Sequence, residues 1–165
     1  PNQIDYIEQT CSDIGEIASL RKESNLRIAV DESIRKNLGG ELSKLQEVAD
    51  VAIIKWAPTG GISAALEVIE KVNLPVVISS ALDSSVGISH GLALAMATPN
   101  LYGACGLGTV GLLEGDVTSQ PLLPENGFLS PRRINPDLLD RYRAKTERQK
   151  WWQDRVNKIF SGGLN

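Results

Sequence analysis

The sequence predicts an α/β fold built on parallel strands, and three observations predict it. Short apolar runs rich in β-branched residues alternate with longer segments whose apolar residues recur at helical spacing. Each longer segment is of a length that can return the chain to the same edge of a sheet, as parallel neighbours require. With 165 residues, 42% of them hydrophobic and 22% charged, the chain can also bury a core.

Four strand-and-helix units follow one another, and a short fifth strand completes the set. We expect strands at residues 4–8, 26–30, 51–55, 75–79 and 102–105. Helical spacing follows the first four of them, at residues 14–20, 42–49, 64–69 and 85–97. Such strands fit either an open doubly wound sheet or a (β/α) barrel, and periodicity does not separate the two. Because a complete barrel usually needs about 250 residues, this chain would be the later half of one.

The alternation stops after Gly115. Residues 121–129 are punctuated by proline and glycine and predict a small hairpin or strap over the surface, and residues 137–160 predict a charged helix. We therefore expect two regions: residues 1–115, which carry the strands, and residues 116–165, a C-terminal strap and helix that pack on them.

The composition and net charge of the chain limit the kinds of partner that we expect. Its net charge of −3 argues against broad attraction to nucleic acid or to an anionic membrane face, so a small molecule is the expected partner. Cys11 and Cys105 are too few for a disulfide framework or a zinc site, and no secretory leader is seen, which favours a cytoplasmic protein. Since the chain opens at Pro1 directly in an apolar stretch, we expect it to be a piece of a longer protein.

Ionisable residues end the first three predicted strands. Glu8, Asp31 and Lys55 are 23 and 24 residues apart, which is one strand-loop-helix unit each time. Ligands of α/β folds bind at this carboxyl end of the sheet. Two carboxylates on neighbouring strand ends can share a hard divalent cation such as Mg²⁺. The cation and the lysine could then stabilise an enediolate formed by removing a proton beside a substrate carboxylate. The competing interpretation is three solvated charges in ordinary ion pairs.

Two further segments carry weaker signals. Residues 79–85 lie between a strand end and a helix N-terminus, where hydroxyls and backbone N–H groups can hold a carboxylate or simply cap the helix. The glycines at 106, 108 and 111 formally match a dinucleotide fingerprint, but they lead into the proline-rich strap instead of a helix. We expect these glycines to let backbone N–H groups approach an anionic ligand.

Five short segments together resemble the o-succinylbenzoate synthase family of the enolase superfamily, within its mandelate racemase and muconate-lactonizing branch. They are residues 7–9, 30–33, 54–61, 79–87 and 104–109, in order and at the spacing of that family, and the resemblance covers about residues 4–130. It implies a (β/α)₇β barrel of TIM type with an α+β capping domain. The chain would supply about strands 4 to 8, and the strap and helix would pack on the barrel or on the capping domain.

The resemblance also implies roles for individual residues. Glu8 matches the second metal ligand, Asp31 the third, and Glu32 a partner of these ligands. Lys55 matches the lysine that stabilises the enediolate. The cofactor would be Mg²⁺, with Mn²⁺ as an alternative. The residues that match substrate-binding segments are Ser79, Ser80, Gly106 and Leu107.

The family's general-base lysine and its first metal-binding aspartate have no counterpart in this sequence. We expect both before Pro1, in an N-terminal part that also carries the capping domain and strands 1 to 3, so this chain alone should be inactive. For the intact protein the resemblance implies a lyase that dehydrates 2-succinyl-6-hydroxy-2,4-cyclohexadiene-1-carboxylate to o-succinylbenzoate in menaquinone biosynthesis. An N-acylamino acid racemase, a dipeptide epimerase and a non-catalytic α/β binding domain remain alternatives.

Overall fold

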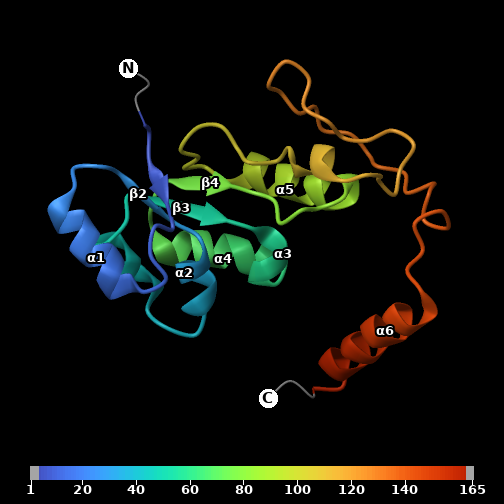
Figure 1. Cartoon of the computed structure of the whole chain (residues 1–165), viewed down its shortest axis with the longest axis horizontal. Helices are drawn as coiled ribbons and strands as arrows, with labels where there is room; N and C mark the ends of the chain where they lie inside the picture. Colours follow the sequence, from blue (N-terminus) through green and yellow to red (C-terminus); the bar gives the residue numbers. More distant parts are fainter. Residues whose placement is uncertain (1–3, 163–165) are drawn as a thin grey trace.

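A computed structural model of the chain describes residues 4–162, and its centre is a parallel sheet (Figure 1). The strands are β1 (Ile7–Glu8), β2 (Ile28–Val30), β3 (Val51–Ile54) and β4 (Val76–Ile78), and they lie in the sheet in the order of the sequence. A fifth segment continues the sheet through two parallel bridges, from Val76 to Leu101 and from Ser79 to Gly106. This order is the one that successive strands of a barrel have, because each crossover adds its strand beside the last.

Helices follow the strands. They are α1 (Ile14–Glu23), α2 (Glu32–Lys36), α3 (Trp56–Thr59), α4 (Ile62–Val72), α5 (Ser85–Ala97) and α6 (Thr146–Phe160), with 3-10 helices η1 (Leu42–Glu47) and η2 (Thr109–Leu112). Figure 1 shows α1, α2 and α4 together on one side of the sheet. The amphipathic spacing of residues 62–72 accounts for α4, which buries Ala65, Val68, Ile69 and Val72.

Both faces of the sheet are buried, as is usual for parallel strands. Alternate strand residues, such as Val30, Ile54 and Ile78, join the main core with the helices. The residues between them form a second, smaller cluster on the other face with two tyrosines: Ala29, Val51, Ile53, Val77, Tyr6 and Tyr102. The period of two thus divides every strand between a helix-covered face and a face of the kind that lines a barrel.

Several predicted elements differ in extent from those observed. Leu42–Glu47 form a 3-10 helix, and a short helix α2 that the periodicity did not predict precedes it. The first four strands are one to three residues shorter than expected, and the predicted strand at residues 102–105 is represented only by the bridges of Leu101 and Gly106. The predicted helix at residues 137–160 was wrong in its first part, because α6 begins only at Thr146. Before it the chain is held to the strap, where Leu138 N donates to Val117 O at 2.9 Å and Tyr142 packs on Gly115 so closely that a Cβ there would overlap the ring.

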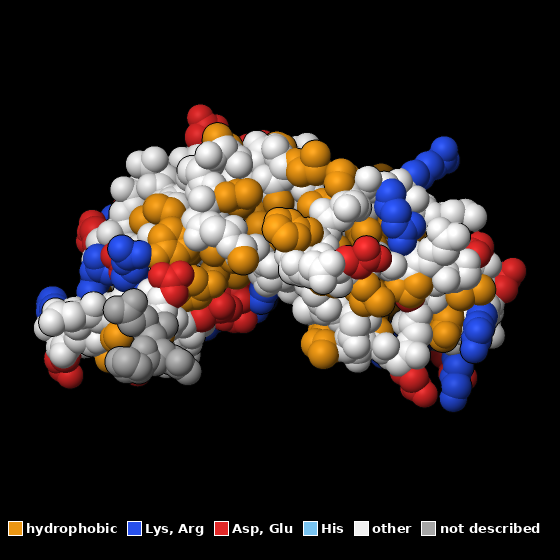
Figure 2. All heavy atoms as spheres, turned by 90° about the horizontal axis from the view of Figure 1, so that it is seen from above, with side chains coloured by type: hydrophobic (Ala, Val, Ile, Leu, Met, Phe, Trp, Pro, Cys, Tyr) orange, Lys and Arg blue, Asp and Glu red, His pale blue; other side chains and the backbone are white. Residues whose placement is uncertain are grey.

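The C-terminal region contrasts with the sheet. The predicted hairpin is confirmed by an antiparallel bridge between Glu125 and Phe128, with Asn126 and Gly127 in the left-handed conformation that such a turn needs. Helix α6 lies at the end of a long connection, and among the described residues none of its side chains is buried (Figure 1). Hydrophobic side chains are also exposed across the face shown in Figure 2. No helix within residues 4–162 is long and apolar enough to cross a membrane.

Candidate active site

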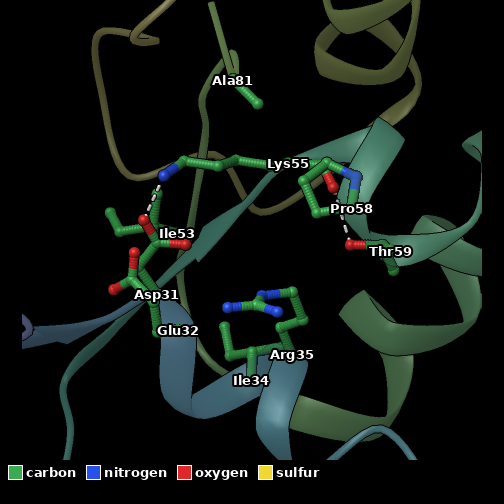
Figure 3. Close-up of a pocket in the computed structure, with 9 residues that line it drawn as sticks. All are labelled: Asp31, Glu32, Ile34, Arg35, Ile53, Lys55, Pro58, Thr59 and Ala81. Carbon is green, nitrogen blue, oxygen red and sulfur yellow. Dashed lines mark hydrogen bonds and ion pairs between the residues drawn. The ribbon is translucent and has the colours of Figure 1, made fainter. Parts of the chain in front are cut away.

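The parallel register brings the three predicted strand-end charges to one edge of the sheet. Glu8 is the last residue of β1, and Asp31 and Lys55 directly follow β2 and β3. Lys55 Nζ donates to Asp31 Oδ2 in an ion pair that Figure 3 marks. The two side chains are only 24% and 11% exposed, so the pair is partly shielded from water.

Negative charge is in excess at this edge. The pKa of Glu8 is raised, first by burial and then by the neighbouring carboxylate of Asp31, with Glu32 adding to the effect and Lys55 opposing it. A bound cation reduces the repulsion between carboxylates that lie this close together, and carboxylate oxygens are the ligands that Mg²⁺ prefers. The donor chemistry therefore fits a divalent metal. Within residues 4–162, however, no three His, Cys, Asp or Glu side chains gather as a metal site.

A small pocket opens beside the ion pair (Figure 3). It has a volume of about 130 Å³, and Asp31, Glu32 and Lys55 form one side of it together with Ala81 from the loop after β4. The guanidinium of Arg35 also faces it and has no ion-pair partner in the described part of the chain. The sequence analysis did not predict Arg35. Its place in α2, one helical turn after the strand-end residue Asp31, could have indicated it.

The predicted substrate loop lies at the next strand end. Ser80 Oγ donates to Gly106 O at 2.8 Å and shares a hydrogen bond with Thr109 Oγ1 at 2.7 Å, and Ser79 Oγ lies 3.4 Å from the same carbonyl. Leu107 is buried against α5. The structure thus brings Ser79, Ser80 and Gly106 together, but they do not line the pocket of Lys55. The hydroxyl of Ser80 is already engaged inside the protein.

The far end of this loop is tied to the C-terminal strap. Asp116 Oδ1 accepts from Ser85 N at 3.1 Å and from Val117 N at 2.8 Å, and Leu122 N donates to Ser85 Oγ at 2.6 Å. Asp116 is buried, and its second oxygen has no hydrogen-bond partner within the described chain. The glycine-rich segment leads into the four-residue η2 and then the strap, as expected.

Parallel strands in sequence order, with charged side chains where the strands end, are the arrangement found in (β/α) barrels. The chain belongs to the enolase C-terminal domain-like family, whose model matches residues 1–136. The resemblance inferred from the five segments is thereby confirmed at the level of the superfamily, and so is the predicted fold class, the C-terminal part of a (β/α)₇β barrel.

Relatives and solved structures agree with this family. An o-succinylbenzoate synthase of Mycobacterium tuberculosis (strain ATCC 25618 / H37Rv) is 46% identical over 160 residues, which is 96% of this chain and 49% of the relative. The protein of the same name in Mycobacterium ulcerans (strain Agy99) is 45% identical over 159 residues, 95% of this chain and 48% of the relative. The chain spans about half the length of the curated relatives it matches.

Solved structures show the same fold. The muconate lactonizing enzyme of Pseudomonas putida has a TM-score of 0.72 and 23% identity, covering 84% of this chain and 42% of that one. The enzyme of Pseudomonas fluorescens, complexed with muconolactone, has a TM-score of 0.74 and 22% identity, covering 86% and 41%.

Proposed function

We propose that the intact protein carrying this chain is an o-succinylbenzoate synthase, a lyase of the enolase superfamily in menaquinone biosynthesis. It would remove water from 2-succinyl-6-hydroxy-2,4-cyclohexadiene-1-carboxylate by syn elimination and release o-succinylbenzoate. The observation that carries this proposal is the 46% identity to relatives of that name over 160 residues, since the match runs past residue 136, where the shared family model ends.

Glu8 and Asp31 would hold Mg²⁺, or Mn²⁺, and Glu32 would support them from beside Asp31. When bound, the cation lowers the free energy of the negative charge that develops on the substrate carboxylate. Lys55 contributes a second positive charge, and its ion pair with Asp31 keeps the ammonium group at the same edge. The α-proton would pass to a base from the preceding half of the protein, and that base, on the same face of the ring in a syn elimination, would return a proton to the leaving hydroxyl, which departs as water. Aromatisation of the ring drives the reaction.

Substrate contacts would come from the neighbouring strand ends. We assign them to Ser79 and Ser80 and to Gly106 and Leu107. The Ser80 hydroxyl and the Ser80 backbone N–H both donate to Gly106 O, and the Leu107 side chain is buried. The backbone N–H of Leu107 is therefore the better candidate for a substrate contact. A Cβ at Gly106 would lie 2.8 Å from Ser79 Oγ, which favours glycine at this close approach of the two strand ends.

The remaining partner is the N-terminal part of the same protein, with the capping domain and strands 1 to 3. In the described sheet β1 pairs only with β2, so its outer edge is free for such a strand. Covering by that part also accounts for the hydrophobic side chains exposed in Figure 2. In this proposal residues 1–115 are the barrel part, residues 116–165 are a strap and helix packing on the barrel or capping domain, and the protein is cytoplasmic.

The test is an assay of the intact protein with Mg²⁺. We expect dehydration of the cyclohexadiene substrate, its loss when a chelator is added, and its loss in Lys55→Met. The control variant is Lys71→Met, because Lys71 is exposed on α4, where it pairs with Glu67. The 165-residue chain alone should show no turnover, since it lacks the base.

Other outcomes would contradict the proposal. Exchange of the α-proton of an N-acylamino acid or dipeptide without dehydration would indicate a racemase or epimerase with the same edge of charges. Absence of either reaction, with normal folding of the intact protein, would indicate a non-catalytic binding domain.

A further inference from the structure

Asp31 occupies the N-cap position of α2 but does not cap that helix. An aspartate in this position usually accepts a hydrogen bond from a backbone N–H of the first turn. Asp13, before α1, does so through Gly15 N at 2.7 Å and Glu16 N at 3.4 Å. Within residues 4–162 the carboxylate of Asp31 makes no such bond and instead accepts from Lys55. Another group must therefore accept hydrogen bonds from the first backbone N–H groups of α2.

The side chain of Gln9 takes that place. Its Oε1 accepts from Asp31 N at 2.9 Å and from Ser33 N at 3.1 Å, and the second of these is a bond that an N-cap side chain ordinarily makes. Its Nε2 donates to Ser33 Oγ at 2.8 Å and to Cys11 O at 2.9 Å. Since two backbone N–H donors meet one atom of the amide, that atom must be the oxygen, and both ends of the amide are fully used.

The backbone conformation of Gln9 is an unfavourable one, which indicates that this side chain is needed at this position. Its φ is +41°, in the left-handed region that residues with a side chain rarely adopt. Gln9 N still donates to Ala29 O at 2.8 Å, so the residue keeps the register of β1 with β2 while its side chain turns toward α2. Glycine would adopt this conformation without strain, but it would leave the first N–H groups of α2 without their acceptor.

We propose that Gln9 caps α2 in place of Asp31, and thereby keeps the Asp31 carboxylate directed at the site with Glu8 and Lys55. Gln9 is then a positioning residue that acts through Asp31. Its effect on metal binding rests on the proposed function, because that function makes Asp31 a ligand. The claim that Gln9 caps α2 in place of Asp31 depends only on the hydrogen bonds among Gln9, Asp31 and Ser33.

The first test is Gln9→Met in the intact protein, which keeps the length of the side chain and removes its polar atoms. Asp31 is then free to cap its own helix, so α2 persists and the melting temperature changes little. The affinity for Mn²⁺, measured by calorimetry, should fall about 10- to 100-fold, as when a partner of a metal ligand is lost. kcat should fall more than KM rises. Gln9→Glu keeps the accepting oxygen and should retain most of the Mn²⁺ affinity. Gln153→Met, on the exposed α6, is the matched control.

A second readout needs no metal. When Asp31 turns to its own helix, Lys55 loses its partner, so amine labelling of Lys55, followed by mass spectrometry, should become several-fold faster in Gln9→Met. Labelling at the wild-type rate would overturn the proposal, and so would a Gln9→Glu variant that labels as fast as Gln9→Met. If wild-type protein neither binds Mn²⁺ nor dehydrates the substrate, the proposed function fails, whereas the labelling still decides the role of Gln9.

Discussion

The amino and carboxyl ends of the sheet differ in how their charged side chains are paired. At the amino end, Arg21 donates to both oxygens of Asp50, at 2.7 and 2.9 Å, and Asp50 also accepts from Ile28 N at 3.0 Å. The Arg21 hydrogen bond is the main cause that holds the pKa of Asp50 below its usual range. At the carboxyl end, burial and Asp31 raise the pKa of Glu8. Charged groups are thus paired at the amino end and crowded at the carboxyl end, which is the end where (β/α) barrels bind their ligands.

The residues just before β1 also meet the segment that continues the sheet beyond β4, at the amino end. Tyr102 Oη donates to Asp5 Oδ1 at 2.9 Å and accepts from Arg27, and its ring stands edge-on to Tyr6 at 6.1 Å. These contacts join segments 97 residues apart in the sequence. The amino end is therefore held together by paired groups, whereas at the carboxyl end Glu8 and Glu32 form no ion pair within residues 4–162.

The largest effect should come from the carboxyl end. Asp31→Asn in the intact protein removes a ligand charge and the partner of Lys55, so we expect the Mg²⁺ affinity to fall by more than the ~100-fold that loss of a ligand's partner causes. Dehydratase activity should fall with it. The melting temperature should change little, because Gln9 and not Asp31 caps α2. Calorimetric titration and thermal unfolding measure the two quantities.

An unchanged Mg²⁺ affinity in Asp31→Asn would refute the assignment of this residue as a ligand. Asp13→Asn is the matched control, because Asp13 caps α1 and belongs to no charged edge. It should leave both stability and metal affinity nearly unchanged, because Asn caps a helix about as well as Asp.

The amino end should show the reverse result. Asp50→Asn keeps the shape of the side chain but removes its charge, so the hydrogen bonds from Arg21 weaken. We expect a loss of about 1 kcal/mol in the free energy of unfolding, near the upper value for partly exposed ion pairs, and a melting temperature lower by about 2–4 °C. kcat and KM should not change. A loss of activity without a loss of stability would contradict the proposed division between the two edges.

The sequence predicted which charged residues lie at the carboxyl end of the sheet better than it predicted the contacts that position them. The spacing of Glu8, Asp31 and Lys55 suffices to place them together, because parallel strands in chain order align equivalent positions. The cap by Gln9 depends on a left-handed backbone and a side-chain rotamer, which no periodicity encodes. Likewise, the late start of α6 depends on contacts of residues 138 and 142 with the strap, which are distant in sequence and invisible to a local pattern.

The smallest effect is the pH dependence of the amino end. The folded state holds the pKa of Asp50 below its ordinary value of 3.8, so the ionised side chain stabilises the fold at any pH above that value. The stabilisation is lost as pH falls through the lowered folded pKa, because Asp50 then takes up a proton in both states. The difference in free energy of unfolding between wild type and Asp50→Asn should therefore be constant from pH 7 to about pH 5 and shrink below pH 4. Urea titrations across this range measure it, with Glu41→Gln, in an exposed ion pair with Lys44, as the control. A difference that persists undiminished at pH 3 would mean that the charge of Asp50 is not what stabilises this end of the sheet.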